Sequence, residues 1–272
     1  MSIYNILVAF NGSDSAVSAL KYATSLARNG ANVTALLAHS THEVINSRAA
    51  WVPAKAREIL EQANADILDK IEVRFEALRD TLALGDRLHF RREAGRVDAV
   101  LSECARSYDI LIMGQDRAEN VDEHVVQHPD RIALMSGRPV LIVPEDHDAS
   151  ANHAHAVIAW DGSRASARAL SDSLGLLEDQ GRVTVLTIGN EPTPRPVSEL
   201  LMHLERHDVK ATHEVIDSVP GPARAILAYC RDQDPCLLVM GAFEHSKFRE
   251  DFLGGVTARV IKDTSIPVLL SH

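Results

Sequence analysis

The feature that most constrains this chain is an internal repeat. Four short segments of the first half return in the same order in the second half. The repeated pairs are residues 6–13 and 156–163, 95–101 and 221–227, 110–114 and 237–241, and 139–142 and 267–270. An ordered repeat over most of a chain indicates a duplicated structural unit. The sequence therefore predicts two copies of one domain, over residues 1–147 and 153–272, joined by a polar linker at residues 145–155.

Each copy alternates short apolar runs with segments whose apolar residues have helical spacing. The runs are continuous, which is typical of strands buried on both faces of a parallel sheet. The expected strands are residues 6–10, 33–38, 110–113, 140–143, 156–160, 183–188, 237–240 and 268–270, with weaker candidates at 88–92 and 212–216. Strands that alternate with helices form right-handed βαβ units. The predicted fold class is α/β, with two tandem doubly wound parallel sheets.

The first half also carries extra residues between Ala38 and Arg92. Pro53 opens a stretch with apolar side chains at helical spacing, and neither Gly nor Pro interrupts it as far as Leu84. Proline suits the first turn of a helix. The sequence predicts a long helix over residues 53–82, whereas the second half has only a shorter candidate at 197–207.

Composition excludes several classes of protein. Of the 272 residues, 46% are hydrophobic, enough for a core, and the formal net charge of −10 disfavours binding to nucleic acid or to an anionic membrane. No apolar run approaches the roughly 18 residues that span a bilayer, and residues 1–5 lack the pattern of a signal peptide. Three cysteines without a CxxC pair suit a reducing compartment. The cytoplasm is the expected location.

Landmarks of the second half resemble a known family. They are Asp161-Gly162-Ser163 after the first strand, Met240-Gly241 closing the fourth, the loop Leu253-Gly254-Gly255-Val256-Thr257, and Pro267 before the last strand. Together with the repeat, they resemble the universal stress protein family in its tandem form. The resemblance implies a five-stranded parallel sheet in each half, of the adenine nucleotide alpha hydrolase-like type, with helices on both faces. It also implies that residues 139–143 and 267–270 meet within the chain as a pseudo-dimer, and two such chains could associate further as a homodimer.

The same resemblance implies an ATP site in many members, although other members bind no nucleotide. The family's phosphate loop has Gly, two residues, Gly, nine residues, Gly, then Ser or Thr. Gly241 and Gly254 keep the first and third glycines, whereas Glu244 and Gly255 depart from the pattern. The candidate nucleotide-binding residues are Asp161, Gly162, Ser163, Ile188, Gly241, Gly254, Gly255, Val256 and Thr257. The implied ligand is ATP or another adenine nucleotide, with Mg²⁺.

Physical chemistry supports part of this assignment and opposes part. A helix that begins at Gly254-Gly255 offers free N–H groups and a positive dipole end to a phosphate. Asp161 would lie beside the crevice at the carboxyl edge of the sheet. Carboxylates at Glu244, Glu250 and Asp251 oppose a triphosphate, although Lys247 and Arg249 could offset them.

The first half lacks most of these features. Asn11 replaces the aspartate, and no glycine occurs between Gly114 and Gly137. We therefore expect the first half to keep the scaffold and to have lost the site.

Histidines and serines supply the other candidates for catalytic or metal-binding groups. His203 and His207 have the i, i+4 spacing of a zinc pair, and His147, His153 and His155 cluster in the linker. A solvated helix explains the first pair better, and no metal site is expected. Ser163 is expected to cap a helix rather than to act as a nucleophile.

The leading hypothesis is a non-enzymatic stress-response protein. Its second domain would bind the nucleotide, and its long helix would face an unknown protein partner. An alternative is a slow ATPase or nucleotidyl transferase that uses Asp161 and Glu244 in the same crevice. Another alternative is a purely structural interaction module with both sites lost.

Overall fold

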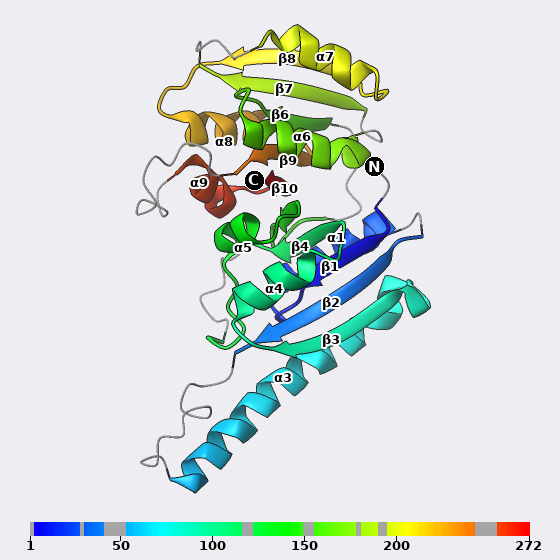
Figure 1. Ribbon diagram of the computed structural model, residues 1–272, viewed down its shortest axis with the longest axis vertical. Helices are drawn as coiled ribbons and strands as arrows, with labels where there is room; N and C mark the ends of the chain where they lie inside the picture. The colour runs from blue at the N-terminus through cyan, green and yellow to red at the C-terminus, as the bar shows by residue number, and fades with distance from the viewer. Residues whose placement is uncertain are drawn as a thin grey trace.

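A computed structural model describes residues 3–27, 30–40, 53–115, 122–148, 155–177, 181–189, 195–242 and 255–272. Its centre is a ten-stranded sheet in the order β3-β2-β1-β4-β5-β10-β9-β6-β7-β8 (Figure 1). The strands are β1 Asn5–Ala9, β2 Asn32–His39, β3 Leu88–Ala94, β4 Ile110–Gly114, β5 Val140–Val143, β6 His155–Ala159, β7 Arg182–Ile188, β8 Ala211–Ile216, β9 Leu237–Gly241 and β10 Val268–Ser271. All ten predicted strands are confirmed.

The two halves meet edge to edge. Within each half the five strands are parallel and have the same order, whereas β5 and β10 pair in the antiparallel direction. Leu141 lies opposite Leu269 at this seam, and both side chains are fully buried. The predicted meeting of residues 139–143 with residues 267–270 is therefore confirmed, and it makes the two sheets continuous rather than stacked face to face.

Helices cover both faces of the sheet, as expected for a doubly wound fold. The helices are α1 Asp14–Leu26, α3 Ala54–Leu82, α4 Val97–Ala105, α5 Pro129–Met135, α6 Arg164–Leu177, α7 Val197–Glu205, α8 Pro222–Gln233 and α9 Val256–Asp263. One core holds Ile6 and Val8 together with buried residues of α1, α3, α6 and α7. The other core holds Leu7 and Ala9 together with those of α4, α5, α8 and α9. Because side chains alternate along each strand, continuous apolar runs supply both cores.

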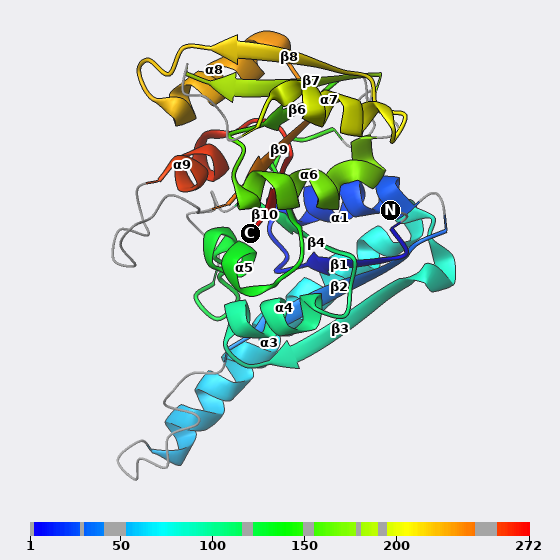
Figure 2. The ribbon, with the colours of Figure 1, turned by 45° about the horizontal axis from the view of Figure 1, so that its top comes forward.

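The predicted long helix is α3, and it projects beyond the sheet of the first half (Figures 1 and 2). Its C-terminal part is anchored by Phe75, which is fully buried. The Phe75 ring stacks on Phe90, with centroids 4.7 Å apart, and meets the edge of Phe10 at 5.8 Å. Among the described residues, no helix combines the length and the apolar character that crossing a membrane requires.

Candidate functional site

The carboxyl edge of the second-half sheet gathers most of the predicted site residues. β6 lies between β7 and β9 and runs parallel to both. Its chain continues through Asp161, Gly162 and Ser163 into α6, while β7 ends at Ile188 and β9 at Gly241. Parallel neighbouring strands end at one edge, which is where doubly wound sheets bind ligands. The structure thus brings these five residues to one edge.

The turn from β6 into α6 is held by its own side chains. The Asp161 carboxylate accepts a hydrogen bond from the Ser163 N–H at 3.0 Å. The Ser163 hydroxyl oxygen accepts one from the Ser166 N–H at 3.1 Å, which is the capping bond expected from the sequence. Gly162 has a φ of 75°, in the left-handed region that favours glycine. Each of these three residues therefore has a structural role that needs no ligand.

Gly241 also has a packing role. A Cβ on this residue would lie 2.5 Å from the backbone nitrogen of Ser166 and 2.6 Å from the carbonyl carbon of Ala165. Its counterpart in the first half, Gly114, is equally crowded, with the carbonyl carbon of Ser15 at 2.6 Å. Glycine lets the end of each strand pass close to the first turn of a helix. The family resemblance assigned Gly241 to the phosphate loop, and packing alone also requires a glycine there.

The start of α9 supplies the remaining described residues of the candidate site. Gly255 is the N-cap residue, and no side chain caps the helix there. Its φ is −72°, and a Cβ would meet nothing within 4 Å, so this backbone would accept a larger residue. Val256 is 36% exposed, whereas Thr257 is 6% exposed. The first N–H groups of a helix have no partner within it, so they can bind an anion. Predicted residues that lie outside the described part of the chain are Glu244, Lys247, Arg249, Glu250, Asp251 and Gly254.

In the first half, residues that follow β4 cover the corresponding edge. The Ser40 N–H donates to the carbonyl of His124 at 2.8 Å, and the Asn11 amide group donates to the carbonyl of Val125 at 3.5 Å. Val125 is 1% exposed and belongs to the same core as β1. His124 and Val125 therefore pack against the residues that follow the carboxyl ends of β1 and β2.

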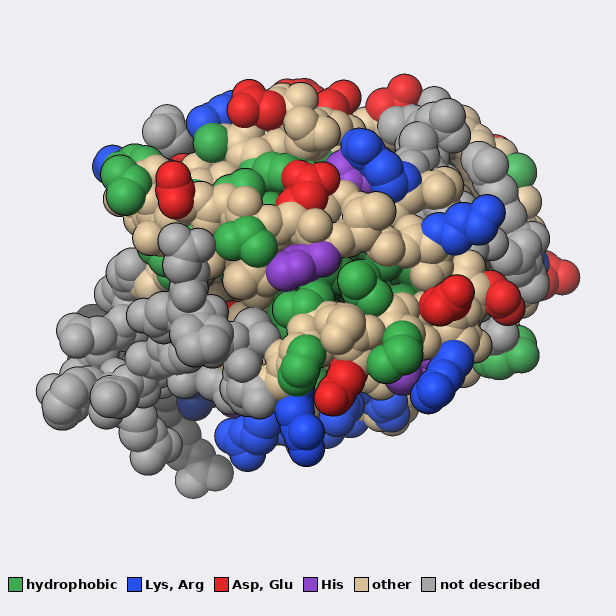
Figure 3. Space-filling model, turned by 90° about the horizontal axis from the view of Figure 1, so that it is seen from above, with side chains coloured by type: hydrophobic (Ala, Val, Ile, Leu, Met, Phe, Trp, Pro, Cys, Tyr) green, Lys and Arg blue, Asp and Glu red, His purple; other side chains and the backbone are tan. Residues whose placement is uncertain are grey.

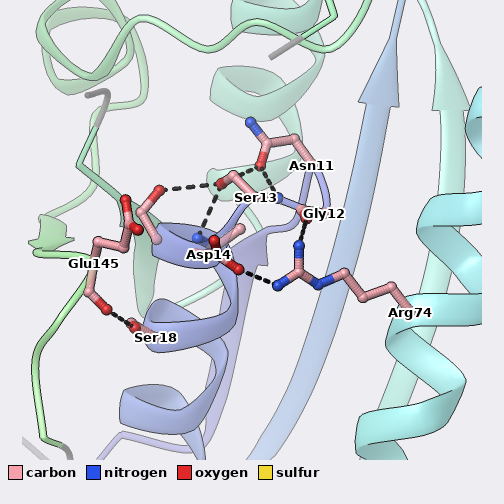
Figure 4. A network of polar contacts seen from close by, with 9 residues as sticks. Asn11, Gly12, Ser13, Asp14, Ser18, Arg74 and Glu145 are labelled. Atoms are coloured by element: carbon pink, nitrogen blue, oxygen red, sulfur yellow. Dashed lines mark hydrogen bonds and ion pairs between the residues drawn. The ribbon is translucent and has the colours of Figure 1, made fainter. Parts of the chain in front are cut away.

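The long helix α3 also contacts this edge, at the turn between β1 and α1. The Ile71 side chain lies so close to Gly12 that a Cβ on Gly12 would be 2.9 Å from it. Arg74 donates to the carbonyl of Gly12 and pairs with the Asp14 carboxylate (Figure 4). Sequence reasoning missed both residues, because nothing in the local pattern of α3 indicates which loop it will meet.

Comparisons with known proteins agree with this architecture. The model of the universal stress protein family matches the chain twice, over residues 3–144 and 153–272. The chain belongs to the universal stress protein family. A universal stress protein of Synechocystis sp. is 27% identical, over 97% of this chain and 98% of its own length.

Two solved structures resemble this universal stress protein over its whole length. A universal stress protein from Archaeoglobus fulgidus has a TM-score of 0.72 at 16% identity and covers 100% of this chain and 96% of its own. A protein of unknown function from Pseudomonas aeruginosa has a TM-score of 0.56 at 13% identity, with 99% and 92% covered. At these identities the likeness concerns the fold.

The sequence pointed to two groups of histidines as candidate metal ligands, and the structure describes all of these residues except His153. The prediction that His155 belongs to the linker is wrong. His155 is the first residue of β6 and is 6% exposed. The His203 and His207 rings are 4.8 Å apart, although α7 ends at Glu205. Within the described part of the chain, no group of three or more metal-ligating side chains is found.

The surroundings of His155 predict a dependence of stability on pH. Arg182 donates to its Nδ1 at 2.9 Å, so Nδ1 carries no proton and the Nε2 N–H donates to the Thr184 hydroxyl at 3.0 Å. Burial, followed by the charge of Arg182, lowers the pKa of His155 below 6.5. The folded state thus favours the neutral ring. Its contribution is complete above the unfolded pKa and is lost as the pH falls from there through the lowered folded pKa.

We therefore expect the free energy of unfolding to decrease as the pH falls from 7.5 to 5, and His155→Gln to make this decrease shallower. Part should remain, because burial and Arg92 also lower the pKa of His39. Urea unfolding at several pH values measures the slope. His89→Gln, at an exposed position of β3, is the control and should leave the slope unchanged. A slope that is identical in His155→Gln and the unsubstituted chain would contradict this account.

Proposed function

We propose that this universal stress protein is a non-enzymatic regulatory module that binds ATP or another adenine nucleotide at the carboxyl edge of its second half. The observation that carries the proposal is a difference between the two edges among the residues that the structure describes. Residues of the first half, Val125 and Ile71 among them, occupy its own edge. In the second half, Asp161 and the start of α9 lie at the same edge, and a Cβ added to Gly255 there would meet no atom within 4 Å.

A reversal of charge between the halves also supports an anionic ligand. Asp14 begins α1 in the first half, and the repeat places Arg164 at the same position of α6. A cation in the first turn of a helix is disfavoured by the helix dipole, so the dipole does not account for an arginine at this position. At this edge its guanidinium could meet a phosphate. The outer end of the second half, by β8 and α7, carries mixed acidic and basic side chains, so charge there favours no polyanion (Figure 3).

Binding of the nucleotide would bias a surface that meets protein partners, and α3 is the surface we propose. Enzymatic turnover is the competing function. It would require carboxylates that hold a metal ion near the phosphates. Of the two candidates, Asp161 accepts the Ser163 N–H through Oδ1, which is one of the two acceptor oxygens of its carboxylate, and Glu244 lies outside the described residues. A structural module with both sites lost is the other alternative, and it predicts no affinity for nucleotides.

Calorimetric titration of the full chain with ATP and Mg²⁺ tests the proposal, and Gly255→Ser sharpens it. Serine restores the family residue where the backbone accepts it. One added hydrogen bond contributes about 0.5–1.5 kcal/mol, so affinity should rise by a factor of about 2 to 12. Gly255→Ala is the matched control, because it adds the Cβ without the hydroxyl, and its affinity should stay near that of the unsubstituted chain.

Charge reversal gives the opposite expectation. Arg164→Asp, which copies the first half, should weaken ATP binding about tenfold or more, because hydrogen bonds to charged groups contribute about 1.5–3 kcal/mol. Arg168→Asp, one turn further along α6, is the control.

cAMP should be titrated as well, since a universal stress protein of 24% identity, with a TM-score of 0.35 over 53% of this chain, has been solved in complex with it. No heat at millimolar ATP, with no gain in Gly255→Ser, would refute the proposal, and phosphate release that depends on Asp161 would favour the enzyme.

A further inference from the structure

A side chain of the first half holds the end of a helix in the second. Gln115 directly follows β4, and its side chain is buried at 1% exposure. Its amide nitrogen Nε2 lies 2.5 Å from the carbonyl oxygen of Ile261, 3.0 Å from that of Lys262 and 3.2 Å from that of Thr264. These carbonyls belong to the last turn and the C-cap of α9. One carboxamide therefore supplies donors that this helix end cannot find within itself.

The contact breaks the symmetry of the repeat. The residue that corresponds to Gln115 in the second half is Ala242, which has no donor to offer to α5. Both helix ends already have local bonds, from the Ser136 hydroxyl to the carbonyl of Arg138 and from the Thr264 hydroxyl to that of Ile266. Among the described residues, the end of α5 receives a side-chain donor from its own half, Arg106 to the carbonyl of Met135 at 3.4 Å, and none from the other half. The fold alone therefore does not require a donor across the seam at this position.

The buried side chain of Gln115 also makes an unfavourable contribution to the stability of the fold. Its Oε1 is buried without a hydrogen-bond partner among the described residues, which is unfavourable. A methionine or leucine of similar size would avoid that cost but would leave the carbonyls of α9 without this donor. The glutamine therefore has a buried oxygen that is unfavourable, and the hydrogen bonds that its Nε2 donates to the end of α9 are what offset it.

We propose that Gln115 is a positioning residue through which the first half holds α9, the helix whose other end carries Gly255 and Thr257. The inference rests on the proposed function, because that function places the nucleotide at the start of α9. A helix of 8 residues has few internal hydrogen bonds, so a bond at one end limits fraying and tilting of the whole. The first half thus serves the second as a fixed support.

Amide hydrogen exchange of the full chain tests this inference. Gln115→Met keeps the size of the side chain and removes the donor. We expect amides of residues 256–264 to exchange at least tenfold faster, while those of β9 and β10 stay within twofold. A general loss of stability would instead accelerate exchange in all three elements. Gln127→Met is the matched control, because Gln127 is also buried in the first half but its Nε2 has no partner among the described residues; exchange in α9 should not change.

The affinity for ATP separates this inference from the proposed function. If the chain binds ATP, Gln115→Met should weaken binding at least threefold, and Gln127→Met should leave it unchanged. Unchanged exchange in α9, or an equal change in all three elements, overturns the inference whatever the nucleotide result. Faster exchange confined to α9 in a chain that binds no nucleotide supports the hold of Gln115 on α9 and refutes the proposed function.

Discussion

Replacing Gly241 with alanine should lower the free energy of unfolding by about 3 kcal/mol, at the upper end of the range for overpacked sites. The new Cβ would lie 2.5 Å from the backbone nitrogen of Ser166, and backbone cannot move aside as a flexible side chain can. Either β9 or the first turn of α6 must shift. Gly114→Ala should have a similar effect, because the first half repeats the same contact with Ser15. Urea unfolding of the two variants measures both losses.

The control for this prediction is Gly255→Ala. It also replaces a glycine at the carboxyl edge of the second half, but its Cβ would meet nothing within 4 Å. We expect its free energy of unfolding to fall by no more than about 1 kcal/mol, because alanine is a poorer N-cap than glycine but meets no neighbour. If Gly241→Ala keeps the stability of the unsubstituted chain and loses only ATP binding, the packing explanation is wrong and Gly241 belongs to the ligand site.

Most of the fold could be predicted from the sequence, because the central strands are continuous runs of apolar residues. β1, β4 and β5 are buried on both faces, so neither side of the strand has to be polar. The two weaker candidates became β3 and β8, which are the edges of the sheet and have mostly exposed residues. An edge strand shows a weaker apolar pattern because solvent replaces one of its neighbours. The repeat compensated for this, since each weak strand occurred at the same place in both halves.

The candidate site was less predictable because its physical contacts join distant parts of the chain. Nothing near Gly12 in the sequence indicates that Arg74 will bond to its carbonyl, and nothing near Asn11 indicates Val125. The sequence predicts that the first half has lost the site, but it does not indicate that residues after β4 pack against that edge. Nothing in the sequence around Gln115 indicates that its side chain meets α9 of the other half.

Phe75→Ala should lower the free energy of unfolding by about 3–5 kcal/mol. The ring is fully buried between Phe90 and Phe10, and the guanidinium of Arg79 lies 5.0 Å from its centroid. Removing it takes away the main anchor of α3 and leaves a cavity that neighbouring rings can fill only in part. Val73→Ala is the control on the same helix, because Val73 is 68% exposed, and its effect should be under about 0.5 kcal/mol.

The same variant tests which half binds a nucleotide. Weaker docking of α3 loosens the hold of Ile71 and Arg74 on the first-half edge, while α6 and α9 of the second half have no part in that contact. In buffer where Phe75→Ala is still folded, we therefore expect its affinity for ATP to stay within about twofold of the unsubstituted chain, a difference below about 0.5 kcal/mol. A tenfold loss of affinity, equal to that expected for Arg164→Asp, would place the site beneath α3 and contradict an assignment to the second half.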